Sequence, residues 1–240
     1  MLDSIVAGVE LGRASFVNMR RFLTYHLTDN VAELTPFVVW ALSGGSFPLA
    51  LGVLQILALD IGTDTLSATA LGAEPPSRHL MERPPVSGRL FDRVVAWRAF
   101  GLLGPLIALG SMAAFVVSFV AAGWRPGDPY PTGDALAAAS GAAFMTVVIG
   151  QAANVFACRS SSRSAASLGW TTNPLLIGAK SVDLMISLAM LLIIPIANQL
   201  GHAPPPLVGW LVAVLTAMSV LVVDSADKRR RAHSHDARMM

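Results

Sequence analysis

Charged residues are scarce in this chain. Asp, Glu, Lys and Arg make up 13% of its 240 residues, whereas about 25% is usual for a soluble domain. Hydrophobic residues make up 54%, so the composition excludes an ordinary soluble domain and indicates a membrane protein. The single cysteine, Cys158, excludes an intramolecular disulfide framework and a Cys-rich metal site. The formal net charge of only +2 gives no indication of a nucleic-acid partner.

The beginning of the chain is not expected to be a secretory signal peptide. Such a peptide has a basic start, a short apolar run and a small-residue cleavage site. Here Asp3 and Glu10 come early, and Arg20 and Arg21 come late. Residues 1–21 are therefore predicted to form a cytoplasmic amphipathic stalk helix that leads into the first apolar segment.

Long apolar stretches fill most of the remaining sequence. A helix that crosses a bilayer needs about 20 consecutive, mostly apolar residues. We therefore expect an all-α membrane protein, with a bundle of six transmembrane helices in residues 22–223. The predicted spans are residues 22–42, 48–71, 94–122, 135–158, 174–200 and 206–223.

Positive charges are distributed unevenly between the connections. Of the 17 Lys and Arg residues, only Arg125 is assigned to an odd-numbered connection, and Lys180 falls inside the fifth span. We assign the others to the N-terminal segment, the even-numbered connections or a basic tail at residues 224–240. Since cytoplasmic loops are enriched in Lys and Arg, both termini are predicted to be cytoplasmic. The tail is interpreted as a topology anchor beside anionic headgroups of the cell membrane.

Polar residues inside the spans are grouped on shared helix faces. Ionisable groups at bilayer depth usually face the interior of a bundle and mark ion pathways. Three helices with oxygen-bearing faces could hold a hard cation, which takes six or more oxygen ligands. Carboxylates on adjacent spans would repel one another unless cations or protons neutralise them. The groups are Asn30 with Glu33, Asp60 and Asp64 with Thr63, Gln151 with Asn154, and Lys180 with Asp183.

Some of these residues have a plainer interpretation. Gln151 and Asn154 fit hydrogen bonds between helices as well as they fit ion ligation. Lys180 and Asp183 fit an internal salt bridge better than a binding site. Asp29, near the cytoplasmic half of its span, fits a hydrated entrance.

Two backbone features favour an ion site. Pro36 has no N–H, so the Ala32 carbonyl next to Glu33 lacks its usual intrahelical partner. Gly62 lies between the two aspartates and could loosen the helix there. Transporters use such broken helices to coordinate ions.

The sequence resembles the P-type cation-transporting ATPases. The stretches "LTDNVAELTPF" and "LALDIGTDTLSATALGAEPP" are similar to the fifth and sixth transmembrane helices of type II pumps of the sodium/potassium and calcium kind. "N-x-x-E" followed by "D-x-x-T-D" is the specific element. "GQAANVFACRS" resembles the eighth helix, and "TTNPLLIGAKSVDL" more loosely resembles the start of the ninth. The resemblance covers nearly the whole chain.

This resemblance implies cation-site roles for named residues. It implies that five residues in the stretches matched to the fifth and sixth helices bind the cation: Asn30, Glu33, Asp60, Thr63 and Asp64. Gln151 matches a polar position of the eighth helix. Asp29 departs from the family pattern, which has a small hydroxyl residue before the Asn. Because Asp29 adds negative charge near the site, the ion specificity of a relative is not transferred.

The family's catalytic motif is absent. The pumps phosphorylate the Asp of a D-K-T-G motif, and neither Lys180 nor Lys228 stands in such a motif. We therefore expect no cofactor in this chain and no ATP hydrolysis by it alone; ATP and Mg would act only in a complete pump. Its expected partners are the lipid bilayer and a catalytic P-type chain that supplies the missing helices and cytoplasmic domains.

Three hypotheses follow for the function. The first is a C-terminal pump domain that exists as a fragment, a subunit of a split pump or a stand-alone paralogue. The second is a non-enzymatic membrane protein that regulates a complete pump. The third is a passive carrier of cations or protons.

Overall fold

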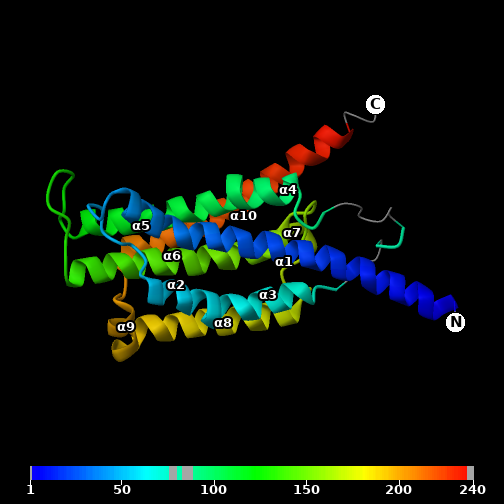
Figure 1. Ribbon diagram of the computed structural model, residues 1–240, viewed down its shortest axis with the longest axis horizontal. Helices are drawn as coiled ribbons and strands as arrows, with labels where there is room; N and C mark the ends of the chain where they lie inside the picture. Colours follow the sequence, from blue (N-terminus) through cyan, green and yellow to red (C-terminus); the bar gives the residue numbers. More distant parts are fainter. Residues whose placement is uncertain (1, 76–79, 83–88, 237–240) are drawn as a thin grey trace.

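The structure is a computed structural model that describes residues 2–75, 80–82 and 89–236 (Figure 1). Its regular elements are all helices, and the described residues contain no strand. The all-α prediction is therefore confirmed. Part of the connection between the second and third predicted spans lies outside the described residues.

The helices follow the predicted spans closely, although two runs contain π-helical segments. The first run is α2 (Val53–Leu59), η1 (Asp60–Asp64) and α3 (Thr65–Gly72), and the second is α4 (Arg93–Ala96), η2 (Trp97–Leu103) and α5 (Gly104–Ala121). The other helices are α1 (Leu2–Leu42), α6 (Asp134–Cys158), α7 (Ala165–Leu168), α8 (Pro174–Leu192), α9 (Ile194–Leu200) and α10 (Leu207–Asp236). The predicted stalk and first span thus form one helix, and α10 continues through most of the predicted tail.

Both termini lie at one end of the bundle, where α1 and α10 extend beyond the other helices (Figure 1). The α1–α2 and α5–α6 connections and the short helix α9 lie at the opposite end. Gly44 and Gly45 make the α1–α2 turn with φ values of 63° and 79°, a region that glycine enters without steric cost. This alternation agrees with the charge pattern, while the side of a membrane on which the termini lie stays a prediction.

Four helical runs in the described part of the chain are long and apolar enough to span a bilayer: Arg93–Ala121, Asp134–Cys158, Pro174–Leu192 and Leu207–His233. The first two predicted spans, in α1 and α2–α3, are not among them. Both carry acidic residues at mid-helix, which lowers their hydropathy. The count of six spans therefore stays a prediction.

The fifth predicted span is shorter in the structure than expected. Helix α8 ends at Leu192, and Ile193 is extended with ψ 103°. The separate helix α9 then begins at Ile194 with Pro195 in its first turn, since proline fits the first turn of a helix but interrupts the interior of one. The His202 imidazole contacts the Met190 carbonyl at 3.2 Å and so occupies one of the carbonyls freed at the end of α8.

Helix α6 lies at the centre of the bundle, and its Phe144 and Met145 are fully buried. They belong to an apolar cluster with Phe115 and Phe119 of α5. Close approach between the helices depends on small residues, as is usual in membranes. At Gly110 of α5, for example, a Cβ would lie 2.2 Å from Thr216 Oγ1 of α10.

A buried polar network joins four elements at the terminal end of the bundle. Glu74, just after α3, accepts hydrogen bonds from Arg159 Nε at 3.0 Å and from Asn173 Nδ2 at 2.6 Å. Asn18 of α1 donates to the Glu74 carbonyl at 2.8 Å. Asn173 also caps α8 by accepting from the Leu176 N–H at 3.0 Å. The network therefore fixes the stalk part of α1 to the ends of α3, α6 and α8.

Asp92 forms a second link between the stalk and the bundle. It caps α4 by accepting from the N–H groups of Val94 and Val95 at 3.0 and 2.9 Å, and it pairs with Arg20 of α1. Although partial burial works against ionisation, these hydrogen bonds and the Arg20 charge hold the pKa of Asp92 below its usual range.

One cationic residue lies where the charge pattern did not place it. Arg98 was counted with the residues of the connections, although the predicted third span, residues 94–122, contains it; in the structure it lies inside η2 and is 3% exposed. Its guanidinium pairs with Asp224 of α10 at 2.7 Å. Lys228, one turn further along α10, pairs with the same carboxylate and donates to the Ala157 carbonyl at 2.7 Å. The beginning of the predicted tail is thus fixed inside the bundle.

Candidate cation-binding site

The candidate site lies where the second predicted span departs from regular α-helix. Residues Asp60–Asp64, "DIGTD", form the π-helical segment η1. Such segments widen a helix by one residue per turn and are frequent at functional sites. The Thr65 hydroxyl donates to the Asp60 carbonyl five residues earlier, at 3.2 Å. The prediction that the helix loosens around Gly62 is confirmed.

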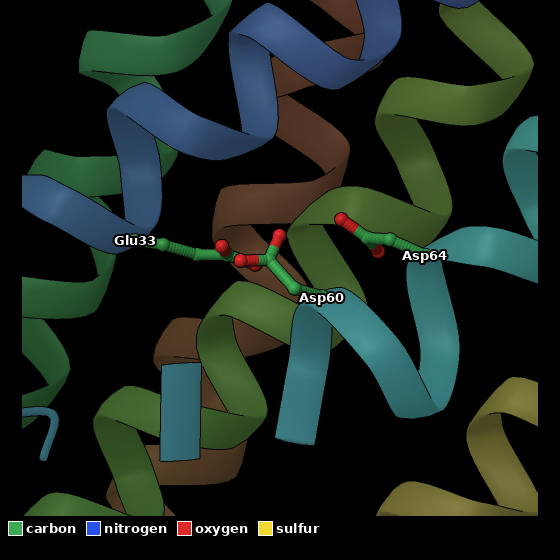
Figure 2. Close-up of side chains that lie close together, drawn as sticks. All are labelled: Glu33, Asp60 and Asp64. Atoms are coloured by element: carbon green, nitrogen blue, oxygen red, sulfur yellow. The ribbon is translucent and has the colours of Figure 1, made fainter. Parts of the chain in front are cut away.

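Three carboxyl groups meet at this segment. One oxygen each of Glu33, Asp60 and Asp64 lies within 4.8 Å of the others. Figure 2 shows Glu33 reaching from α1 towards Asp60, with Asp64 on the next turn of η1. Glu33 and Asp64 are each 1% exposed, and Asp60 is half-buried. The structure therefore brings together, from two segments, the three carboxylates that the sequence singled out.

Two neighbouring side chains hold this carboxylate cluster. Gln151 Nε2 of α6 donates to Glu33 Oε1 at 2.7 Å and lies 3.3 Å from Asp64 Oδ2. The Tyr25 hydroxyl of α1 donates to Asp64 Oδ1 at 3.1 Å. Gln151 of α6 thus contacts carboxylates from both α1 and η1, so it joins three segments and not only two helices. Tyr25 was missed in the sequence, although its spacing from Glu33 places both on one face of α1.

The cluster requires a compensating charge. Two like charges separated by a distance of this order repel by about 3 to 4 kcal/mol at an effective dielectric constant near 20. Glu33 Oε2 is buried, and no described group hydrogen bonds to it. A hard cation bound by carboxylate oxygens supplies the missing charge and the missing partner. Protons could also neutralise the carboxylates.

The other two predicted ligands are placed differently. Thr63 is 2% exposed within η1, and its hydroxyl donates back to the Leu59 carbonyl at 2.8 Å. Its oxygen keeps lone pairs available for a cation. Asn30 is only half-buried, and its amide makes no hydrogen bond with any described residue. The structure therefore does not bring Asn30 to the carboxylates as closely as it brings Gln151.

Asp29 lies in the interior, so the hypothesis that it forms a hydrated entrance is wrong. It is 0% exposed, and its Oδ1 accepts a hydrogen bond from Asn154 Nδ2 at 2.9 Å. Tyr25, Asp29 and Glu33 follow one another at intervals of four and share the buried face of α1. The spacing of Asp29 from Glu33 was the signal that could have placed it there.

The Lys180 and Asp183 pair also lies beside the site. Lys180 Nζ lies 3.2 Å from Asp183 Oδ2, and both residues are buried. The Ser67 hydroxyl of α3 donates to the same carboxylate oxygen. The prediction of an internal salt bridge is confirmed.

Comparison with known families gives one match over most of the chain. Residues 48–230 match the family described as "Cation transporting ATPase, C-terminus". The match begins before η1 and ends within α10, so it includes Asp60, Asp64 and Gln151. Glu33 and the rest of α1 precede it.

Curated relatives are similar over about half of the chain. The sodium/potassium-transporting ATPase subunit alpha-3 of Rattus norvegicus is 37% identical over 129 residues, which is 52% of this chain and 12% of that protein. The alpha subunit from Tetronarce californica has the same identity and coverage. The alpha-4 subunit of Rattus norvegicus is 36% identical over 129 residues. The aligned part of this chain thus corresponds to about 12% of the length of these relatives.

Proposed function

Because the chain belongs to the family of C-terminal domains of P-type cation-transporting ATPases, and is an integral multi-pass membrane protein, we propose that it carries part of the site for the transported cation. The observation that supports this most strongly is the buried cluster of Glu33, Asp60 and Asp64. Three carboxylates at this depth are costly without a cation or protons. Their meeting at a π-helical segment fits a site that must open and close.

In this proposal the cation ligands come from three segments. Glu33, Asp60 and Asp64 supply charged oxygens, and Thr63 adds its hydroxyl oxygen. The Gln151 amide, which now donates to Glu33, can turn to present its carbonyl oxygen when a cation neutralises the carboxylates. In this proposal Asn30, which is only half-buried, becomes a ligand only if α1 rotates.

The proposed mechanism is ATP-driven alternating access in a complete pump. Phosphorylation and nucleotide domains, together with ATP and Mg, would be supplied by protein outside these 240 residues, either on a partner chain or on a longer one. Helix α1 carries Glu33 and extends beyond the bundle (Figure 1), which suits it to transmit movement from those domains. We place six spans in the plasma membrane with both termini in the cytoplasm.

The test is cation binding by the purified chain, read as cation-dependent thermal stability in detergent. A ligand that binds only the folded state raises the melting temperature, and above its dissociation constant the gain grows with the logarithm of the ligand concentration. We expect one of the chlorides of sodium, potassium, calcium and magnesium to stabilise the wild type more than the others do at equal concentration, with a gain that grows with the logarithm of the cation concentration. Asp60→Asn and Asp64→Asn should weaken the apparent affinity at least tenfold, which corresponds to about 1.4 kcal/mol.

Asp128→Asn is the matched control, because Asp128 is exposed in the α5–α6 connection. It should leave the cation response unchanged. A wild-type response in both Asp60→Asn and Asp64→Asn would contradict the site. Where the catalytic part can be combined with this chain, the same two variants should abolish cation-stimulated ATP hydrolysis.

A further inference from the structure

Lys180 points deeper into the bundle and not towards its nearest end. It lies in the second turn of α8, about 9 Å from the first residue of that helix at 1.5 Å per residue. A lysine near a helix end usually extends its ammonium back towards the membrane surface. Lys180 Nζ instead lies 3.2 Å from Asp183, which is three residues further along α8. The whole residue is only 9% exposed.

The ammonium lies beside the proposed cation site. Lys180 Nζ is 5.9 Å from the centroid of the Tyr25 ring, within the range in which a cation is attracted to an aromatic face. The hydroxyl of that same ring donates to Asp64 at 3.1 Å. Ser67, from the helix that follows η1, donates to Asp183. The cation on Lys180 is therefore separated from Asp64 by one aromatic side chain.

The surrounding charges are mostly negative. The acidic residues of this region are Asp29, Glu33, Asp60, Asp64 and Asp183. Among the described residues, Lys180 is the one Lys or Arg that pairs with any of them. Asp183 Oδ1 is buried, with no hydrogen-bond partner among the described groups, while Oδ2 accepts from both Lys180 and Ser67. Asp183 thus forms a small anionic site, and the cation in this site is the ammonium group of Lys180.

We propose that Lys180 is a fixed internal cation: its ammonium occupies a monovalent-cation position, formed by Asp183 and the face of Tyr25, next to the exchangeable site at Glu33, Asp60 and Asp64. The inference rests on the proposed function, because it concerns how many exchangeable ions the acidic region holds. An ammonium tethered by a side chain cannot leave, so this position is removed from transport. Replacing Lys180 by a neutral residue of similar length frees it for an alkali cation.

The experiment counts bound ions on the full chain in detergent. Equilibrium binding of ²²Na⁺ and ⁸⁶Rb⁺ is measured on the wild type, Lys180→Met, Lys180→Arg and Lys180→Met with Asp183→Asn. We expect Lys180→Met to bind about one more monovalent cation per chain than the wild type at saturation, since a site that stabilises a cation fills when the tethered one is removed. Lys180→Arg should match the wild type, because it keeps the charge. The double variant should lose the additional ion, because the carboxylate that holds it is gone.

Adding Asp64→Asn to Lys180→Met separates the two positions. The exchangeable site should weaken while the additional ion stays bound. Wild-type stoichiometry in a folded Lys180→Met protein would overturn the inference. So would a Lys180→Met protein that fails to fold in both rubidium and choline chloride while the double variant folds, because the pair would then be a structural salt bridge. Folding of Lys180→Met in rubidium but not in choline chloride supports the inference.

The two proposals fail in different ways. Absence of saturable binding to the wild type, for every cation tested, overturns the proposed function. If the wild type binds no cation but Lys180→Met binds one monovalent cation, the proposed role of Lys180 would still be supported. Absence of binding by both proteins overturns both proposals.

Discussion

At the scale of single residues, the site depends on which face of α1 is buried. Asn30 and Asp29 are both spaced to share a face with Glu33, and only packing decides between them. The buried stripe includes Tyr25, Asp29 and Glu33, each at most 1% exposed, whereas Asn30 is half-buried. The family-like pattern selected Glu33, which is buried, but it also selected Asn30, which is less buried than Asp29.

Gln151 gives a prediction at this scale. Replacing it by leucine removes the carbonyl oxygen that Gln151 presents to the cation in the proposed site, and polar contacts with a charged group contribute about 1.5 to 3 kcal/mol. We expect Gln151→Leu to weaken the apparent affinity for the cation about tenfold or more, which corresponds to at least about 1.4 kcal/mol. Titrating the melting temperature against cation concentration measures this.

Gln55→Leu is the control for Gln151→Leu. Gln55 is equally buried, at 1% exposure, but its amide bonds to Ser140 at 2.9 Å, away from the carboxylate cluster. It should lower stability without changing the apparent cation affinity. Equal cation affinity in the two variants would show that Gln151 is only a bridge between helices.

At the scale of helices, the two π-helical segments and the break at Ile193 decide the positions of the polar groups. Segment η1 carries both aspartates of the site, and η2 carries Arg98. Gly62 in η1 and Gly101 in η2 were visible in the sequence, but a glycine alone does not reveal whether a helix widens or continues. Pro36 shows the contrast, because α1 continues through it.

Gly62→Ala tests the role of η1. Alanine favours regular helix over glycine by about 1 kcal/mol, and its Cβ would lie 3.1 Å from the flexible end of Met190. We therefore expect a protein that is as stable as the wild type or more so, with weaker cation binding because the π-helical turn becomes less favourable. Thermal unfolding with and without cation measures both effects.

Gly178→Ala provides the comparison. Gly178 is exposed at the beginning of the second turn of α8, and an added Cβ there meets nothing within 4 Å. It should raise the melting temperature without changing cation binding. If Gly62→Ala behaves in the same way, η1 has no part in binding.

At the scale of the whole molecule, the connections alternate between the two ends of the bundle, and the predicted orientation depends on this alternation. Figure 1 shows the termini at one end and the α1–α2 and α5–α6 connections at the other. The stalk part of α1 is joined to this terminal end through Asn18 and Glu74. A force on the stalk would therefore reach α3, α6 and α8 together.

Cysteine labelling in intact cells tests the orientation. Cys158 is the one native cysteine and is 3% exposed, so a Cys158→Ser background accepts single exposed cysteines. Ser46→Cys and Thr132→Cys should react with a membrane-impermeant maleimide from outside. Ser162→Cys, in the α6–α7 connection, should react only after permeabilisation. Labelling of Ser162→Cys in intact cells, with Ser46→Cys and Thr132→Cys labelled only after permeabilisation, would contradict the predicted orientation.

The sequence by itself determined the helical class, the family and the three carboxylates of the site. Composition and hydropathy act locally, and the spacing of Asp60 and Asp64 places them on successive turns of one face of the same helix. The alternation of positive charge between connections likewise needs no tertiary information. Pairing within α8 was also local, since Lys180 and Asp183 are three residues apart.

Only the tertiary structure decided which polar groups meet across helices. The contacts of Gln151 with Glu33, Asn154 with Asp29 and Tyr25 with Asp64 depend on the rotation of each helix about its axis. That rotation is set by packing of the whole bundle, including the close approach of α5 to α10 at Gly110. The physical reason is that periodicity fixes the angles between residues within one helix, whereas contacts between helices depend on how their surfaces fit.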